Sequence, residues 1–399
     1  MNQAIDTEAV RQWVADNAKP LPPAGSPQIL GAVIGDAVVT GLGETTRQAH
    51  EVVVVAHHMM RYLVEHKGYR ALALADDSSV VAELDDYVRN GSGTAAGLVA
   101  NMWAPWRTTE TVDVIEWIRS YNRQHADDPV RLLGLGPVAI RVDDYDKVVE
   151  HVRGAAPRQA AELEERYDTI RTAHDLGEHV QRSRGIHPGR PFVELAREAY
   201  ELVATLGGTP ADERVKDIAE RIVEFHDNTV AANYDFQATA TAMATSIVDY
   251  HLATGRKVVF WEGIAHTAAA TALSNIMFAE PLHTTGGRLR ERLGDGYASV
   301  VIGFDHGRIH DGVEIPMPPR DFSDAVLGGA EPDVYLLDLR AERPEAVGHW
   351  LRGDHKLRVI AGIYDPGQDA RHYVAGGPLD EWFNAVVRVR EITETTMLG

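Results

Sequence analysis

The stretch Gly41-Leu42-Gly43-Glu44-Thr45-Thr46-Arg47 (GLGETTR, residues 41–47) ends an apolar run and precedes a segment of helical periodicity. This order is typical of a strand that leads into a helix, so Glu44 and Arg47 are expected at the carboxyl end of a strand. The stretch lacks the third glycine of GxGxxG and the basic residue of a P-loop, and Glu44 would repel a phosphate. It therefore predicts a site for acid/base work or binding rather than a nucleotide loop.

Outward from this stretch, strand-like runs alternate with helical patterns. The strand-like runs cover 69–76, 130–137, 257–263, 297–304, 334–339 and 358–364, and the helical patterns cover 46–66, 80–89, 108–124 and 266–277. A turn at Gly35-Asp36 also favours a hairpin over residues 32–44. The alternation predicts the α/β class, with a mostly parallel sheet flanked by helices.

The chain changes character between residues 142 and 254. This part gives one helical pattern after another and almost no strand signal. We therefore predict an α/β core domain made of residues 1–141 and 255–399. The sequence predicts a large helical insertion at 142–254, between core strands, that forms one wall of a cleft.

Composition excludes several classes of protein. The net charge of −20 disfavours a nucleic acid or an anionic membrane as the main partner. The absence of cysteine rules out disulfides, thiolate metal sites and a cysteine nucleophile. No segment has the pattern of a secretory signal or the length of a membrane span. We expect a cytoplasmic protein that acts on a small molecule, without a cofactor.

Polar residues lie at the ends of three of the predicted strands. Glu44 and Arg47 follow the first, Asp76 the second, and Glu262 and His266 come at the end of the 257–263 strand. Ligands of open α/β sheets bind beyond the carboxyl ends of the strands, so these side chains are expected to share one site. The sequence predicts that Glu44, His266 and Glu262 are catalytic and that Arg47 and Asp76 bind substrate.

Trp106 and Arg107 lie in a loop before a helix N-terminus, for which Thr108 and Thr109 are the N-cap candidates. An aromatic ring beside a cation suits the rim of a ligand site. A packed loop, with Arg107 paired to a surface carboxylate, is an equal alternative. We include both residues among the predicted substrate-binding groups.

Histidine spacing offers only weak evidence for a metal. His50 and His57 share a helix face two turns apart, roughly 10 Å, which is too far for both to hold one ion. His306 and His310 have a better spacing but fall in an expected hairpin. No Gly-x-Ser-x-Gly elbow is present, which disfavours an ordinary serine hydrolase. We expect no bound metal.

Several segments, in order along nearly the whole chain, resemble the erythromycin esterase-like proteins. They are GLGETTRQAHEVVVVAHHMMRYLVEHKGYRALALADD, WAPWRTTETVDVIEWIRSYN, ANYDFQATATAMATSI, VVFWEGIAHTAAA, LRERLGDGYASVVIGF, VYLLDLR and LRVIAGIYDP. The resemblance implies that a glutamate and histidines around a deep cleft activate water and hydrolyse a macrolide lactone, without a metal.

Position by position, the resemblance implies a changed site. Glu44 matches the family's first glutamate and His266 matches the second histidine of its His-Asn-x-His run. Arg47 stands where the family has a histidine base, and an arginine cannot act as a base in a protein. Ala56, Ala75 and Gly263 are small residues at three further positions where the family has polar side chains.

Three hypotheses remain open. The first is a divergent enzyme of antibiotic or secondary-metabolite biosynthesis, where Glu44 or His266 removes a proton and Arg47 with Arg107 holds an anionic group. Its reaction would be an elimination or an intramolecular displacement. The second is an esterase that opens a macrolide-type lactone in resistance or self-protection, with Glu262 and His266 as the acid/base pair. The third is a non-catalytic subunit that stabilises a homologous partner.

Overall fold

The computed structural model describes residues 7–21, 28–136, 140, 142–171, 189–229, 236–275, 281–360 and 364–398. The chain divides into two compact units, one formed by Met1–Gly136 with Phe236–Gly399 and the other by Pro137–Asp235. No helix in the described ranges is both long enough and apolar enough to cross a bilayer.

Within the described ranges, nine strands of the first unit form one sheet in the order β1-β9-β12-β7-β2-β5-β3-β4, with β8 paired to β7. Their bounds are β1 Lys19–Pro20, β2 Val39–Glu44, β3 Tyr69–Asp77, β4 Arg131–Gly136, β5 Lys257–Gly263, β7 Tyr297–Ile309, β8 Val313–Ile315, β9 Val334–Asp338 and β12 Ala385–Ile392. The strands from β12 to β4 are mutually parallel, whereas β9, β1 and β8 pair antiparallel. The predicted α/β class with a mostly parallel sheet is confirmed.

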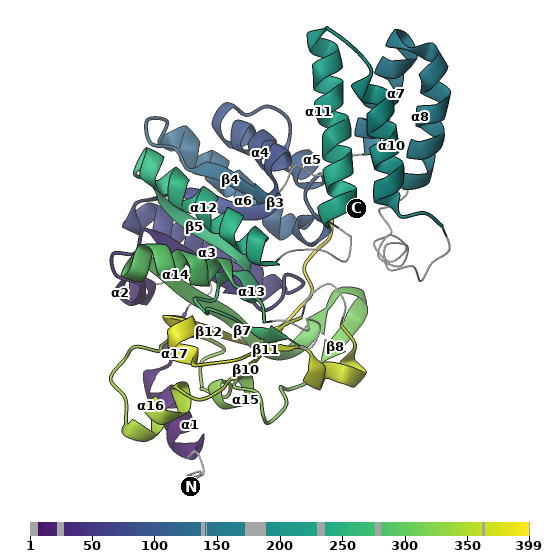
Figure 1. The fold of residues 1–399 in the computed structure, drawn as a ribbon. Helices are drawn as coiled ribbons and strands as arrows, with labels where there is room; N and C mark the ends of the chain where they lie inside the picture. Colours follow the sequence, from purple (N-terminus) through teal and green to yellow (C-terminus); the bar gives the residue numbers. More distant parts are fainter. Residues whose placement is uncertain are drawn as a thin grey trace. The chain divides into compact units, whose positions relative to one another are not determined.

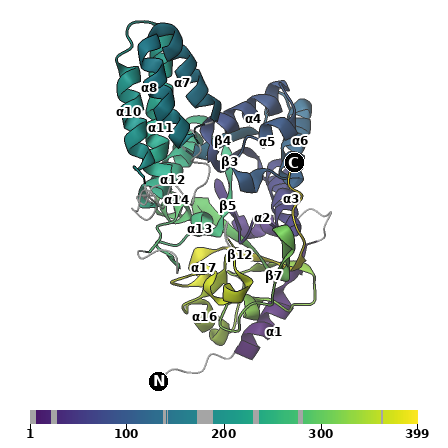
Figure 2. The same ribbon diagram turned by 90° about the vertical axis from the view of Figure 1, so that its right-hand side faces the viewer.

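Helices of the first unit cover both faces of this sheet (Figures 1 and 2). They are α1 Thr7–Asn17, α2 Gln28–Ile34, α3 His50–Lys67, α4 Ser78–Asn90, α5 Ala95–Val99, α6 Thr109–Gln124, α12 Phe236–Thr254, α13 Ile264–Thr267, α14 Thr285–Leu293, α15 Asp324–Leu327, α16 Glu345–Leu351 and α17 Leu379–Trp382. Leu42 and Leu72 share a core with α3, α4 and α6, and Val39 and Phe260 share one with α12 and α14. Successive side chains of each strand point to opposite faces of the sheet, so the strands contribute to a hydrophobic core on each face.

Short elements complete the first unit. A second sheet has the order β10-β11-β6, with bounds β10 Lys356–Arg358, β11 Tyr373–Ala375 and β6 Ser274–Asn275. Single turns of 3₁₀ helix lie at Ala104–Trp106, Gly294–Gly296, His310–Gly312 and Pro366–Arg371.

The second unit is helical. Its elements are α7 Val142–Ala155, α8 Pro157–Ile170, α10 Phe192–Ala204, α11 Pro210–Glu224 and a π-helical turn Phe225–Thr229. It has its own core, in which the buried His226 ring nitrogen and the Tyr145 hydroxyl are 2.9 Å apart. The insertion was expected over 142–254, but α12 packs against α14 and β5 of the first unit. That the helices form one wall of a cleft stays a prediction.

Two predicted elements are wrong. The expected hairpin over 32–44 is instead α2 followed by β2, because Gly35 takes a left-handed conformation (φ 57°) that ends the helix. The expected helix over 266–277 begins earlier and ends at Thr267, although residues 276–280 lie outside the described ranges. Beyond it, backbone N–H groups bond elsewhere, as Ala269 does to the Trp382 carbonyl at 2.9 Å.

The strands near residues 356–392 also differ from expectation. A strand was expected over 358–364, but only Arg358 lies in one, as the last residue of β10. Residues 361–363 lie outside the described ranges. The sequence analysis did not predict β12, whose apolar run is broken by Arg388 and Arg390. Arg388 is nevertheless buried, pairing with Asp324 at 2.5 Å and with Asp305. These carboxylates make the buried charge tolerable within a parallel strand.

The glycines of the opening stretch bring α13 onto β2. A Cβ at Gly41 would lie 2.3 Å from the Tyr297 hydroxyl, and a Cβ at Gly43 would lie 2.2 Å from Oγ1 of Thr267. Both distances are shorter than real contacts, so only glycine fits at either position. This close approach lays the helix that carries His266 directly on the strand that ends at Glu44.

Gly43→Ala should lower the free energy of unfolding by about 1–3 kcal/mol, because the added methyl must displace the buried Thr267. Urea denaturation followed by circular dichroism measures this change. The matched control is Gly154→Ala in α7, where a Cβ meets no atom within 4 Å. That control should be neutral or slightly stabilising. Equal stability of the two variants would contradict close packing of α13 on β2.

Candidate acid/base site at the strand ends

The carboxyl ends of β2, β3 and β5 bring the predicted polar residues to one edge of the sheet. Gly43 lies opposite Glu262 and Glu44 lies opposite Gly263 in the parallel register of β2 and β5. The neighbouring strand β3 ends in Asp76 and Asp77. The site therefore lies wholly within the first unit.

Arg47 lies at the centre of these carboxylates. Its Nε is 3.5 Å from Glu44, and its Nη2 bonds to Glu262. Its side chain is only 12% exposed, and its guanidinium lies 5.5 Å from the ring centroid of Trp103 and 4.7 Å from that of Trp106. Arg47 thus points inward, as the sequence analysis required, and is already paired there.

Burial opposes the positive charge of Arg47, but the carboxylates outweigh it. Loss of water alone would lower the pKa of the guanidinium, whereas Glu262, Glu44 and Asp76 raise it. The net shift is upward, so Arg47 stays positive at every physiological pH. It can hold or polarise oxygen atoms but cannot take a proton.

Glu44 is the most strongly perturbed carboxyl group of the site. It is fully buried, and loss of water raises its pKa from 4.5 to about 7. Arg47 and the nearby Trp261 indole offset part of this shift, and Glu262 adds to it. At neutral pH Glu44 is therefore divided between its acid and base forms, which suits a group that transfers protons.

The carboxylate of Asp76 holds neighbouring backbone in place. Its carboxylate accepts hydrogen bonds from the backbone N–H of Trp103 at 3.0 Å and of Asp77 at 2.6 Å. Burial raises its pKa to about 6, and these two hydrogen bonds lower it in part. Asp77 caps α4 by accepting from the Ser79 N–H at 2.7 Å. Asp76 therefore anchors the loop that carries the two tryptophans.

His266 lies on α13, half-buried, between the influence of Glu262 and Arg47. Burial lowers its pKa, an effect that Glu262 opposes and Arg47 reinforces. The imidazole is therefore neutral at pH 7. It makes no hydrogen bond to any residue that the structure describes, so a ring nitrogen is available to accept one.

The site also contains polar atoms that are buried without a hydrogen bond of normal geometry to the described residues. They are Glu44 Oε1 and Oε2, Arg47 Nε, Glu262 Oε2, Asp77 Oδ2, Trp106 Nε1 and Trp261 Nε1. Unsatisfied buried groups are rare in folded proteins, and such a concentration in one place points to water or ligand atoms. These atoms define where a substrate would be held.

Two residues stand apart from the sequence expectations. Arg107 is exposed, its Nε donates to the Met102 carbonyl at 2.5 Å, and it makes no ion pair with a described carboxylate. The sequence analysis missed Trp261, which contacts the Trp106 ring edge-to-face at 5.7 Å. Trp261 directly precedes Glu262 in β5, but successive strand residues point to opposite faces, so its position alone gave no signal.

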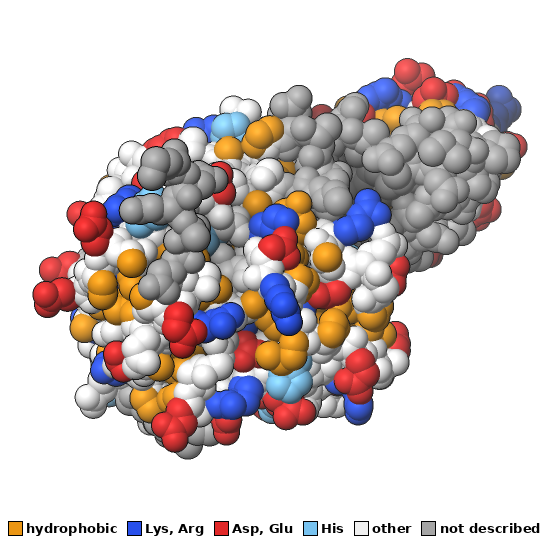
Figure 3. Space-filling view, turned by 90° about the horizontal axis from the view of Figure 1, so that it is seen from below, with side chains coloured by type: hydrophobic (Ala, Val, Ile, Leu, Met, Phe, Trp, Pro, Cys, Tyr) orange, Lys and Arg blue, Asp and Glu red, His pale blue; other side chains and the backbone are white. Residues whose placement is uncertain are grey.

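The expectations about metals and partners stay predictions. Among the described residues, no group of three or more histidine, aspartate or glutamate side chains could hold a metal ion. His306 and His310 lie in the β7–β8 hairpin, as expected. On the face shown in Figure 3, acidic and basic side chains are interspersed rather than gathered into one patch. The expectation that no nucleic acid or membrane binds stays a prediction.

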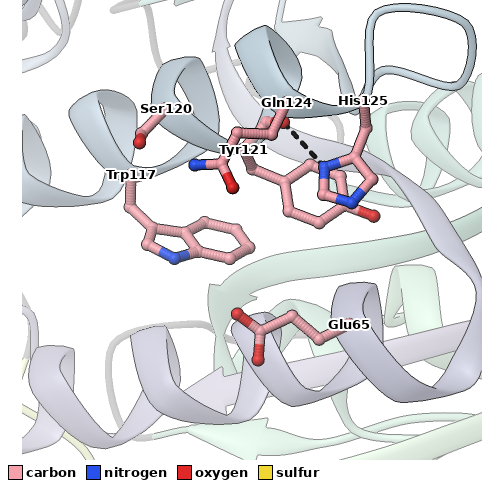
Figure 4. Close-up of a pocket in the computed structure, with 6 residues that line it drawn as sticks. All are labelled: Glu65, Trp117, Ser120, Tyr121, Gln124 and His125. Carbon is pink, nitrogen blue, oxygen red and sulfur yellow. Dashed lines mark hydrogen bonds between the residues drawn. The ribbon is translucent and has the colours of Figure 1, made fainter.

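A second hollow lies between α3 and α6, near their last turns (Figure 4). It has a volume of about 260 Å³ and is lined by Glu65, Trp117, Ser120, Tyr121, Gln124 and His125. Two arginines already lie over its aromatic rings. The guanidinium of Arg61 is 5.3 Å from the ring centroid of Trp117, and that of Arg70 is 5.6 Å from the ring centroid of Tyr121. Glu65 lies fifteen residues beyond the start of α3, roughly 22 Å along the helix. This hollow is therefore separate from the strand-end site.

The perturbed Glu44 predicts a pH-dependent stability difference. Because its pKa is higher in the folded protein, folding takes up protons between pH 4.5 and about 7, and stability falls as pH rises through that range. Glu44→Gln removes the titration. Between pH 5 and pH 8, the free energy of unfolding of the wild type should fall by about 2–3 kcal/mol relative to that of the variant, as measured by urea denaturation. A difference that is the same at both pH values would contradict the raised pKa.

Known proteins share this fold. The family model for erythromycin esterase matches residues 64–392, a range that begins after Glu44 and Arg47. A crystal structure of a Bacillus cereus protein covers 99% of this chain and 100% of its own, with 22% identity and a TM-score of 0.68. A succinoglycan biosynthesis protein covers 100% of both chains, with 19% identity and a TM-score of 0.69.

A variant of the erythromycin esterase EreC, in its open conformation, covers 92% of this chain and 94% of its own. It has 16% identity and a TM-score of 0.54. At such identities these solved structures establish the shared fold, whereas the family model spans most of the sequence. The chain belongs to the erythromycin esterase family.

Proposed function

We propose that the protein is a metal-independent acid/base enzyme that hydrolyses an ester or lactone, with Glu44 as the proton-transferring group. The observation that carries this proposal is a buried carboxyl group with a pKa of about 7 and two oxygens without hydrogen-bond partners. A general base works best when its pKa lies near the working pH. The family assignment and the shared fold with an erythromycin esterase support the same class of reaction.

Each charged residue has a role in this reaction. Glu44 takes a proton from water as the water oxygen attacks the carbonyl carbon. The Nε of Arg47 makes no hydrogen bond of normal geometry to the described residues, and it donates to the oxygen on which negative charge develops. The acyl C–O bond then breaks, and Glu44 returns the proton to the leaving oxygen. Neutral His266 accepts a hydrogen bond from the water and orients it, and Glu262 holds the guanidinium in place.

The charge balance of the site favours an uncharged substrate. Arg47 faces Glu44, Glu262 and Asp76, so carboxylates outnumber the cation that they surround. An incoming anion would meet this excess negative charge and would have to displace Glu262 from Arg47. An ester or lactone needs no such rearrangement. For this reason the esterase hypothesis ranks above the anionic-substrate hypothesis.

A second candidate is elimination or intramolecular displacement in antibiotic or secondary-metabolite biosynthesis. Arg47 Nε, which lies 3.5 Å from Glu44 without a hydrogen bond of normal geometry and beside the Trp106 ring, could hold an anionic leaving group. Glu44 or His266 would then remove the proton, and Arg107 would have to leave the Met102 carbonyl to assist. The fold shared with a succinoglycan biosynthesis protein is compatible with a biosynthetic role. A cytoplasmic setting is part of either proposal.

Purified protein incubated with erythromycin should open the lactone ring, detected by mass spectrometry as the gain of one water. Its kcat/KM should rise with pH through about 7, because Glu44 must be ionised to act as the base. Glu44→Gln should lower kcat by about 10²–10⁴-fold. The matched control, Glu65→Gln in the hollow between α3 and α6, should retain full activity.

Other outcomes separate the alternatives. Turnover only of substrates with a sulfate or phosphate leaving group would support the elimination hypothesis instead. Absence of turnover, together with a homologous protein co-purifying in equal amount, would indicate a non-catalytic subunit. Full activity of Glu44→Gln would refute its role in either reaction.

A further inference from the structure

The segment that follows β12, Thr393–Leu398, runs across the starts of α3 and α6. We call this segment the strap. Figure 2 shows the end of the chain beside these two helices. The strap forms isolated antiparallel bridges, Ala49 with Glu394 and Thr108 with Met397. It therefore touches two segments that are nearly sixty residues apart in the sequence.

The first bridge fixes the turn that carries Arg47. The N–H of His50 donates to the Thr393 carbonyl at 2.8 Å, and the N–H of Thr395 donates to the Gln48 carbonyl at 3.3 Å. Gln48 follows Arg47 directly. The backbone next to the central guanidinium of the site is thus held by the strap.

The second bridge fixes the loop that carries Trp106. The N–H of Thr109 donates to the Thr396 carbonyl at 2.8 Å, and the N–H of Leu398 donates to the Arg107 carbonyl at 2.8 Å. Arg107 follows Trp106 directly. The same six-residue segment therefore holds both partners of the contact between Arg47 and Trp106.

Carboxylates in the first turns of the two helices secure the strap. Glu51 of α3 accepts from the N–H and the hydroxyl of Thr393, both at 2.7 Å. Glu110 of α6 accepts from the N–H of Thr396 at 3.2 Å, and its Oε1 lies 2.8 Å from Nδ1 of His50. Glu110 is buried, which strengthens its hydrogen bonds. Its single carboxylate thereby links α3, α6 and the strap.

We propose that the strap and Glu110 position the site, clamping the Arg47 turn against the loop that carries Trp103 and Trp106. Glu110 is a positioning residue in this proposal because it reaches the site only through the strap and His50. The proposal rests on the proposed function for its catalytic meaning. Its structural content can be tested without any substrate.

The physical basis is the irregular backbone of both loops. Neither segment belongs to a helix or to the sheet between Thr45 and Ala49 or between Asn101 and Trp103. Loops with few regular hydrogen bonds open locally unless other contacts hold them. The strap supplies such contacts from one extended piece of chain, so the two loops are held together rather than separately.

Thr396→Pro and Thr396→Ala form a matched pair for the test. Both remove the exposed hydroxyl, but only proline removes the N–H that Glu110 accepts. Hydrogen exchange followed by mass spectrometry should be read in peptides 43–47 and 101–106, whose amides do not bond to the strap. Exchange in both peptides should rise about tenfold in Thr396→Pro and stay unchanged in Thr396→Ala.

Glu110→Ala should give the same increase without altering the strap, and Glu110→Gln, which keeps an acceptor oxygen, should partly restore slow exchange. Urea denaturation at the same pH checks that each variant remains folded. Unchanged exchange in Thr396→Pro and Glu110→Ala, or faster exchange in only one peptide, would overturn the proposal.

With an active wild type, kcat on erythromycin should fall about tenfold in Thr396→Pro and stay unchanged in Thr396→Ala. Full activity of a variant whose two loops exchange faster would overturn the positioning role. An inactive wild type would refute the proposed function, and the exchange result would still decide whether the strap clamps the loops.

Discussion

The site depends on the burial of Glu44 beside Arg47 at the end of β2. Removing a carboxyl group from water disfavours its charge, and the neighbouring guanidinium offsets only part of that loss. The result is a group that both holds and releases a proton near neutral pH. Arg47 depends on the same arrangement, because Glu44, Glu262 and Asp76 together make its own burial tolerable. Arg47 and the carboxylates thus stabilise one another's charge, whereas the carboxylates repel each other and Glu262 adds to the raised pKa of Glu44.

Close packing maintains this arrangement. Gly41 and Gly43 lack the side chains that would hold α13 away from β2, and His266 is placed beside the strand end as a consequence. On the other side, the strap joins the turn after β2 to the tryptophan loop. Both contacts fix the backbone around the site, where several buried polar atoms make no hydrogen bond to the described residues. Preorganised groups of this kind favour charge that develops during a reaction over charge that is present beforehand.

The resemblance to the family places Arg47 where its members have a histidine, and in the structure this arginine is already paired with carboxylates. Taken alone, an arginine at that position indicates a receptor for an anion. In the structure its charge is committed to carboxylates from β2 and β5. We infer that the substitution transfers the proton-moving task to Glu44, whose raised pKa suits it, and leaves Arg47 to polarise oxygen. The family fold is retained while the division of labour among its polar residues differs.

The sequence by itself determined the α/β class, the polar residues at the strand ends and a capped helix start at Thr108 or Thr109, of which Thr108 accepts from the N–H of Thr111. These features depend on local periodicity and on residue types next to one another. Only the tertiary structure decided that Arg388 lies buried in β12, that α13 ends at Thr267, and that residues before Gly35 form a helix. It also decided the pairing of Arg47 and the pKa of Glu44. The partners of Arg47 and Arg388 include residues between 64 and 215 positions away, and desolvation depends on the whole fold, so no local pattern records them.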